Sequence, residues 1–396
     1  MIISQPTITE ENQEISVSAR VALDNQRNQA PDTLWFKFPS HYRNYVTDRS
    51  DGFIVGLLPS AMALGEKVIV EGITSPRLAY GLREYQQILN AWWPKKFKIV
   101  DIQYDRLQES SSCDSEYGAG SAFSGGVDSF YTLWKHLPDH EELEKYRITH
   151  CLMINGFDKD IDLDDTGAFR QLYDIYEPMM QKLGITLLRS RTNLQKFRLA
   201  SINSSDLHLT FGAPITASTL VLGNLFSRFY IPASHSYAYE TLIPMGAHPI
   251  LDHLLSTETL QLIHDGANAS RTEKIATISQ WNETYSRLRV CLQKAKYDEN
   301  TGQIENCGNC IKCINTMLSL DILDVLPMYA TFPHSLKSQQ IWKARNLTKF
   351  RYKEHLSFAH QQSRKDRIFD LYCYFLQNDV IYPIYAKIRN LFRVFS

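Results

Sequence analysis

The stretch SAFSGGVDSF, residues 121–130, decides the fold of this chain. A small apolar segment runs into a pair of glycines, and a helical pattern begins directly after them. Glycines at the end of a strand let backbone N–H groups approach an anion closely, and the N-terminus of the next helix adds positive charge. The serine hydroxyls add donors, and the aspartate can help to hold a magnesium ion. We therefore predict a phosphate or pyrophosphate site formed by Ser124, Gly125, Gly126, Val127, Asp128 and Ser129.

Other phosphate-binding loops fit this stretch less well. A Walker A loop requires Gly-Lys-Ser/Thr, and no lysine follows Gly126. GAGSAF, residues 118–123, resembles the start of a dinucleotide-binding fingerprint, but Phe123 stands where that fingerprint has its last glycine. A plain strand-to-helix turn with a capping hydroxyl stays open as the structural alternative.

Strands and helices alternate around this loop, from residue 116 to about residue 330. Apolar strands separated by helices predict an α/β fold with a parallel sheet that is covered on both faces. Ligands of such sheets sit beyond the carboxyl ends of the strands, where the loop lies. The predicted strands are 147–154, 185–190 and 230–234, and the predicted helices are 164–184 and 214–229.

The segments on either side indicate two further parts. Residues 1–115 predict a small α+β domain, with a helix that starts at Ser75-Pro76 and stops at Pro94. Its strands are predicted at 15–23, 33–38, 67–72 and 97–104, and the polar residues 108–118 form the linker. Residues 331–396 are predicted to be a helical C-terminal extension. The predicted domains are thus 1–115, 116–330 and 331–396.

Three cysteines in seven residues indicate a metal centre. Cys307, Cys310 and Cys313 form two consecutive C-x-x-C steps, and Cys291 is the natural fourth ligand. Four thiolates make a closed, structural zinc site. Iron–sulfur ligation is the alternative, since three or four thiolates can also hold a cluster. The remaining cysteines are isolated and are predicted to be ordinary small apolar residues: Cys113, Cys151 and Cys373.

Composition places limits on the setting. The 396 residues are 44% hydrophobic and 21% charged, with a net charge of −1, so the whole chain has no bias toward nucleic acid or membrane. The N-terminus lacks the basic start and apolar run of a signal peptide, and no apolar stretch approaches the length of a membrane span. We expect a cytoplasmic protein without membrane contact, in which cysteines serve as thiols or metal ligands.

With these residues in view, Ser124–Ser129 resembles the signature of the PP-loop ATP pyrophosphatases, over roughly residues 116–320. That resemblance implies that ATP is cleaved between its α and β phosphates, that the loop holds pyrophosphate, and that Asp128 is catalytic. A PP-loop followed by Cys291 and then C-x-x-C-x-x-C is similar to the 7-cyano-7-deazaguanine synthases, the QueC family. The resemblance implies ATP, Mg²⁺ and Zn²⁺ as cofactors. It also implies adenylation of a 7-carboxy-7-deazaguanine carboxylate, followed by amide formation.

The parts outside the core depart from that family. The long N-terminal part and the tail resemble instead the QueC-like proteins of antiphage systems, those of type IV CBASS and Qat. This likeness implies that a protein N-terminal amine attacks the adenylate, and we expect residues 1–115 to dock that protein. Three alternatives stay open: a housekeeping synthase that uses ammonia, a tRNA-thiolating PP-loop enzyme, and a nucleotide-binding scaffold without catalysis.

Two further groups of residues bear on the site. Arg271 and Lys274 are three apart, on one helix face if that segment is helical, and could hold pyrophosphate or the acyl carboxylate; a solvated basic face is the alternative. Residues 334–396 carry a basic excess interleaved with aromatic residues, which indicates either RNA or an acidic partner, or an amphipathic helix bundle. Four histidines lie near strand or loop ends without an assigned role: His208, His235, His248 and His264.

Overall fold

The structure is a computed structural model that describes residues 1–24, 30–110, 118–157, 167–238, 243–291, 296–298, 303–342 and 349–376. The chain divides into two compact units. The first unit holds Met1–Phe123 and Thr132–Asn268, and the second holds Ser124–Tyr131 and Ala269–Ser396. The helix that follows the glycine pair, α3 (Val127–Lys135), begins in the second unit and ends in the first.

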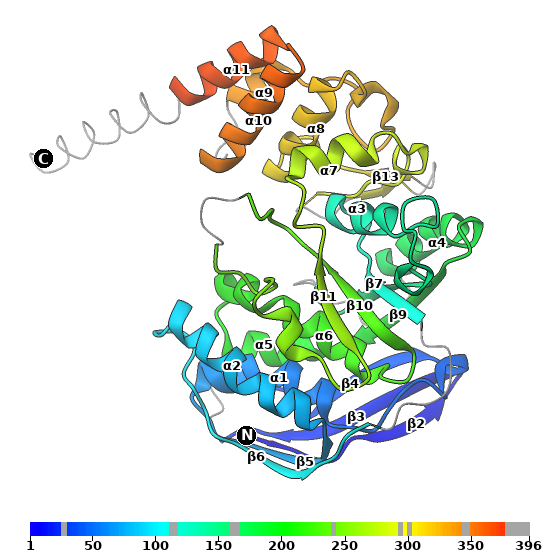
Figure 1. The fold of residues 1–396 in the computed structure, drawn as a ribbon, viewed down its shortest axis with the longest axis vertical. Coiled ribbons are helices and arrows are strands. Elements are labelled where there is room, and N and C mark those ends of the chain that lie inside the picture. Colours follow the sequence, from blue (N-terminus) through cyan, green and yellow to red (C-terminus); the bar gives the residue numbers. More distant parts are fainter. Residues whose placement is uncertain are drawn as a thin grey trace, which may run out of the picture. The chain divides into compact units, whose positions relative to one another are not determined.

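The first unit is built on one large mixed sheet (Figure 1). Its strand order is β11-β10-β7-β8-β9-β4-β3-β1-β5-β6, and β2 pairs with β3 outside this path. The bounds are β1 (Ile2–Ile3), β2 (Thr7–Glu11), β3 (Glu14–Ala22), β4 (Thr33–Pro39), β5 (Val68–Thr74), β6 (Ile102–Leu107), β7 (Gly118–Ala122), β8 (His150–Asn155), β9 (Thr186–Thr192), β10 (Phe226–Pro232) and β11 (Gln261–Asp265).

Two parallel groups of strands meet in the middle of this sheet through an antiparallel stretch. Strands β11, β10, β7, β8 and β9 run parallel to one another, as do β1, β5 and β6. Antiparallel pairs β9–β4, β4–β3 and β3–β1 join the two groups. The predicted α/β class with a largely parallel sheet is therefore confirmed.

Helices cover the sheet and supply one continuous core. Helix α1 (Asp51–Leu64) is buried along almost its whole length, packs against α5 and α6 and also contacts β5 (Figure 1). Its apolar side chains join a single hydrophobic cluster that extends from Met1 to Leu262. The other helices of this unit are α2 (Pro76–Trp92), α4 (Ala168–Lys182), α5 (Leu194–Ser201) and α6 (Gly212–Val221), with short 3₁₀ segments at Ser40–Tyr42, Glu144–Tyr146, Ser204–Thr210 and Asp252–Leu255.

Local patterns predicted several of these elements well. Strand β3 buries every second residue over most of its length, as the alternation of residues 15–23 indicates. Helix α2 begins as predicted: the Ser75 hydroxyl accepts a hydrogen bond from the Leu78 N–H at 3.0 Å, and Pro76 is the first helical residue. The predicted helix at 164–184 corresponds to α4; residues 164–166, like most of the predicted linker, lie outside the described part of the chain.

Two predicted elements were wrong in extent. The helix predicted at 214–229 ends at Val221, and residues 226–229 begin β10 instead, after a turn in which the Asn224 N–H binds the Tyr45 carbonyl. The strand predicted at 97–104 begins only at Ile102. Before it, the N–H groups of Lys98 and Val100 bind the Met62 carbonyl and the Gln86 side chain, so this backbone is not available for a sheet.

The second unit is mainly helical. Helices α7 and α8 pack together and α10 lies against both, while α9 and α10 each contact α11. The bounds are α7 (Arg271–Ile278), α8 (Ile311–Ile322), α9 (Ser338–Trp342), α10 (Lys349–Gln361) and α11 (Lys365–Phe375), with 3₁₀ segments at Asn282–Thr284 and Leu326–Met328. A two-stranded ribbon pairs β12 (Lys296–Asp298) with β13 (Gln303–Glu305).

The compact units divide the chain at places other than the predicted boundaries near residues 115 and 330. Strand β4, from the predicted N-terminal domain, pairs with β9, from the predicted α/β domain, through Phe36↔Thr192 and Lys37↔Arg191. Because this pairing makes the sheet continuous, residues of both predicted domains share one core. Within the described residues, no helix is long and apolar enough to span a membrane.

Helix α2 makes a close approach that only glycine permits. A Cβ added at Gly81 would lie 1.9 Å from the carbonyl oxygen of Leu254. Alanine in a helix is otherwise favoured over glycine by about 1 kcal/mol, but the clash forces the backbones apart at a cost of about 1–3 kcal/mol or more. Gly81→Ala should therefore lower the thermal unfolding temperature of the protein. The exposed Glu84→Ala, one turn away on α2, is the control, and an unchanged or raised temperature for Gly81→Ala would contradict the close contact.

Candidate phosphate-binding loop and metal centre

The glycine loop is shaped by its own serines. Gly125 has φ of +72°, a conformation that L side chains rarely adopt. The Ser129 hydroxyl donates to the Gly126 carbonyl at 3.0 Å and accepts from the Ser124 N–H at 3.3 Å. The Gly126 N–H points to the Ser124 hydroxyl at 3.4 Å. These bonds turn the chain directly into α3, whose first-turn N–H groups make the positive end of a helix.

Asp128 sits on the first turn of α3 and meets two cations from α7. Arg271 Nη1 lies 3.3 Å from one carboxylate oxygen, and Lys274 Nζ lies 3.4 Å from the other. Helix α7 is held in place by a capping box between Ser270 and Glu273. Lys274 is 1% exposed and its Nζ also lies 5.7 Å from the Tyr131 ring centre. The structure thus brings Arg271 and Lys274 together with Asp128 of the glycine loop. The alternative of a solvated basic face is wrong for Lys274, because this side chain is buried.

Further cations surround the same carboxylate. Burial by itself would raise the pKa of the Asp128 carboxyl, but the charges of Lys274, Arg271, Arg351 and Lys312 outweigh burial and lower that pKa. Glu354 braces this arrangement, because its carboxylate accepts the Thr272 N–H at 2.7 Å and pairs with Arg351 at 2.9 Å. Within the described residues, four cationic side chains therefore act on the carboxylate of Asp128, and Glu354 pairs with one of them.

Arg289 adds a fifth cation to this group. Its backbone N–H donates to the Gly125 carbonyl at 2.8 Å, and its charge acts on Lys312. The buried Nε of Arg289 has no hydrogen-bond partner among the described residues. A buried donor without a partner costs free energy unless a ligand satisfies it, so this group favours a bound anion.

The four predicted cysteine ligands converge on one point. The sulfur atoms of Cys291, Cys307, Cys310 and Cys313 all lie within 4.8 Å of one another. The separations are 3.8 Å for Cys307–Cys313, 4.0 Å for Cys291–Cys310 and 3.4 Å for Cys310–Cys313. Four sulfurs about 2.3 Å from a zinc ion lie about 3.8 Å apart in a tetrahedron. The cluster is thus compatible with zinc. Because four protein ligands would leave no open coordination position, such a zinc ion would have a structural role.

A buried amide connects this cluster to the glycine loop. The Asn306 side-chain oxygen accepts the N–H groups of Val290 and Cys291 at 2.9 and 3.1 Å. Its amide nitrogen donates to the Leu288 carbonyl at 2.8 Å and to the Thr331 carbonyl at 3.1 Å. We call residues 288–291 the strap. One end of the strap carries a cysteine ligand, and its middle carries the N–H that holds Gly125.

The remaining predicted residues divide between the units. His208 is exposed in the first unit, whereas His235, His248 and His264 line one pocket there. Cys151 is fully buried, as predicted for a small apolar residue; Cys113 lies outside the described residues. In the tail, Tyr352 stacks on Tyr374 with ring centres 6.2 Å apart, which is packing inside the helical unit. The side chains of Trp342 and Phe350 are outside the described set.

Sequence reasoning missed several site residues: Arg289, Asn306, Lys312, Arg351 and Glu354. Lys312 had a signal, since it lies inside the second C-x-x-C step and is therefore fixed to the metal centre. Arg351 and Glu354 had none, because they come from α10 and reach the loop only through tertiary packing. Comparison with protein-family models, curated proteins and solved structures found no match for this chain.

We predict one zinc ion per chain. Thiolate–zinc bonds contribute folding free energy directly, so Cys307→Ser should reduce soluble yield more than it reduces activity per folded molecule. Elemental analysis of the purified protein provides the count, and Cys373→Ser, outside the cluster, is the control. Iron in place of zinc, or a brown protein, would favour the iron–sulfur alternative.

Asn306→Ala should loosen the strap. The substitution removes four hydrogen bonds at a site that is 5% exposed, at about 1 kcal/mol for each bond. We expect faster loss of zinc to a chelator, measured with a colorimetric zinc indicator. Asn309→Ala changes an exposed asparagine in the same turn region and should lose zinc at the wild-type rate. Equal rates for the two variants would show that Asn306 does not support the cluster.

Proposed function

We propose that this chain is an ATP-dependent ligase that releases AMP and pyrophosphate. Its loop binds the β and γ phosphates of ATP, and a substrate carboxylate attacks the α phosphorus, so that pyrophosphate leaves. An amine then displaces AMP from the acyl-adenylate and forms an amide. The chain would then be a member of the PP-loop ATP pyrophosphatases.

One observation carries the proposal: a glycine loop at a helix N-terminus lies among five cationic side chains of the described residues, four of which act on the Asp128 carboxylate. Such a site favours a multiply charged anion of the size of pyrophosphate. Arg271 and Lys274 would stabilise the charge that develops on the leaving pyrophosphate, and fixed cations supply such stabilisation without reorganisation. The orphaned Nε of Arg289 offers one more donor.

Magnesium fits the site in a restricted way. Both oxygens of Asp128 are paired with cations, one with Arg271 and the other with Lys274. An oxygen would have to give up its cation before it could bind Mg²⁺. Mg²⁺ is commonly bound by one or two carboxylates together with substrate phosphates. Asp128 would hold the ion only when the nucleotide is present, and the ion would neutralise phosphate charge.

The resemblance supplies the substrates of the proposal. The carboxylate would be that of 7-carboxy-7-deazaguanine, and the amine would be a protein N-terminus presented by a partner in antiphage defence. Residues 1–115 would contribute to docking this partner. Proximity is the physical reason for a docking surface, because a protein amine must be held at near-attack distance from the adenylate.

The nucleotide product tests the first half. ATP labelled in its adenine should appear as AMP and not as ADP, with carboxylate substrate present. Asp128→Ala should reduce turnover at least about 100-fold. Because that variant no longer neutralises Arg271 and Lys274, it should bind pyrophosphate more tightly in the absence of Mg²⁺. The exposed Asp139→Ala is the matched control. Release of ADP by the wild type would overturn the proposal.

Intact-mass measurement tests the second half. With 7-carboxy-7-deazaguanine and ATP, a co-encoded partner protein should gain the mass of the acyl group at its N-terminus. Conversion of the same acid to a nitrile with ammonia, without any adduct on protein, would favour the housekeeping synthase. A sulfur-containing tRNA product would favour the thiolating enzyme.

A further inference from the structure

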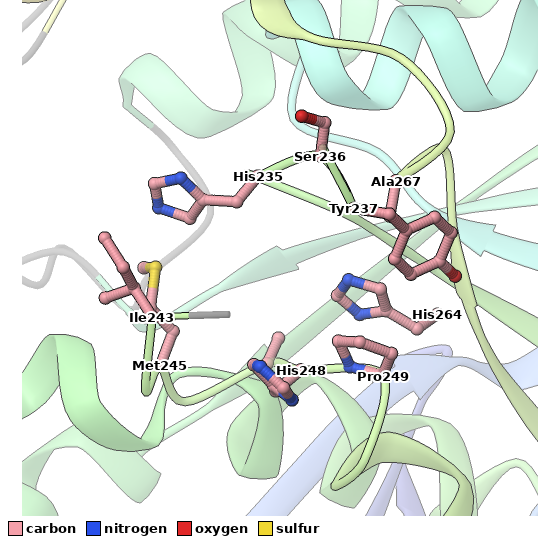
Figure 2. Close-up of a pocket in the computed structure, with 10 residues that line it drawn as sticks. His235, Ser236, Tyr237, Ile243, Met245, His248, Pro249, His264 and Ala267 are labelled. Carbon is pink, nitrogen blue, oxygen red and sulfur yellow. The ribbon is translucent and has the colours of Figure 1, made fainter. Parts of the chain in front are cut away.

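A pocket of the first unit is lined by three histidines (Figure 2). It lies next to the carboxyl ends of the parallel strands β10 and β11, which is where α/β sheets bind ligands. Its other walls are apolar or carry hydroxyl groups, and among the described residues none of its lining side chains is an aspartate, glutamate, lysine or arginine. Such a lining favours a neutral ligand.

His264 is oriented by a buried carboxylate. Its Nδ1 lies 2.7 Å from Asp252 Oδ2, and the Asp252 side chain is 1% exposed. The other oxygen of Asp252 accepts the His248 N–H at 3.2 Å, so the carboxylate is held from two sides. Because Nδ1 donates to the carboxylate, the neutral ring has its lone pair on Nε2. That nitrogen makes no hydrogen bond within the described part of the chain, and it can accept one from a ligand.

His248 is set up in the opposite sense. Its Nδ1 accepts the Ile250 N–H at 3.2 Å, so the ring proton of the neutral form is on Nε2. Burial is the main cause that lowers the pKa of His248, to about 4, and it keeps this neutral form dominant near neutral pH. The residue is 4% exposed, with its ring 5.0 Å from that of Trp92. Its buried Nε2 has no partner among the described residues.

One pocket therefore contains an oriented acceptor and an unsatisfied donor. We propose that it binds a small, neutral, planar amide or lactam, whose N–H donates to Nε2 of His264 and whose carbonyl oxygen accepts from Nε2 of His248. The side chains of Tyr237, Met245 and Pro249 offer apolar surface for the flat faces of the ligand. Every residue that the assignment uses belongs to the first unit, whereas the residues of the glycine loop belong to the second.

A pair of matched probes tests this with the wild-type protein. 2-Pyridone presents an N–H beside a carbonyl on a flat ring, whereas N-methyl-2-pyridone keeps the carbonyl and lacks the N–H. In protein labelled with ¹⁵N-histidine, 2-pyridone should shift the ring signals of His248 and His264, with a Kd of about 1 mM. N-methyl-2-pyridone should bind at least about tenfold more weakly. Equal binding of the two probes, or no shift of either histidine with 2-pyridone, would overturn the proposal.

Variants assign the signals and separate binding from folding. His248→Phe keeps a flat ring against Trp92 and removes the donor, so it should weaken 2-pyridone binding about tenfold or more. Its thermal unfolding temperature should fall only slightly, because the folded protein loses one hydrogen bond. His208→Gln, at an exposed histidine, should bind 2-pyridone as the wild type does. Unchanged binding by a folded His248→Phe would remove His248 from the site and overturn the proposed pairing.

Discussion

The hydrogen bond from the Arg289 N–H to the Gly125 carbonyl couples the two parts of the candidate site. Gly125 has a left-handed backbone, and the Ser129 hydroxyl bonds to the Ser124 N–H and the Gly126 carbonyl on either side of it. The strap that supplies the N–H is fixed by Asn306 and ends at Cys291, a member of the four-cysteine cluster. Loss of metal would therefore act on the loop through two residues of backbone. A metal bound by the four cysteines would in this way influence the shape of the glycine loop without contact with it.

The charges around the loop depend on the same framework. Like charges repel, so five cations near one helix N-terminus destabilise the protein unless something holds them in place or an anion is bound. Asp128 and Glu354 neutralise part of this charge, the capping box fixes α7, and the cysteine cluster fixes Lys312 at the start of α8. Cations that are already in position need no rearrangement when a phosphate arrives.

The sequence predicted most successfully those features that are encoded locally. The glycine loop, the C-x-x-C steps, the cap at Ser75 and the alternation in β3 each depend on neighbours within a few positions. Helix α1 was missed because it is buried all round and contains Pro59, so it has no polar face to give a helical period. The end of α6 was misplaced for a similar reason, since a buried helix and a buried strand follow each other without a change in polarity. Arg351 and Glu354 reach the loop by tertiary packing, which no short-range pattern encodes.

The pairing of β4 with β9 has a consequence for folding during synthesis. The Thr192 hydroxyl binds the Trp35 carbonyl 157 positions earlier in the chain. At ordinary rates of synthesis, β4 waits about ten seconds or longer before its partner strand leaves the ribosome. Over that time β4 lacks its partner strand β9, and its apolar residues Leu34, Phe36 and Phe38 are not yet covered by the complete core. An unpaired apolar strand of this kind tends to associate with other chains. The N-terminal strands of the first unit would thus benefit from a chaperone until residue 192 has emerged, and slower translation would lengthen their exposure.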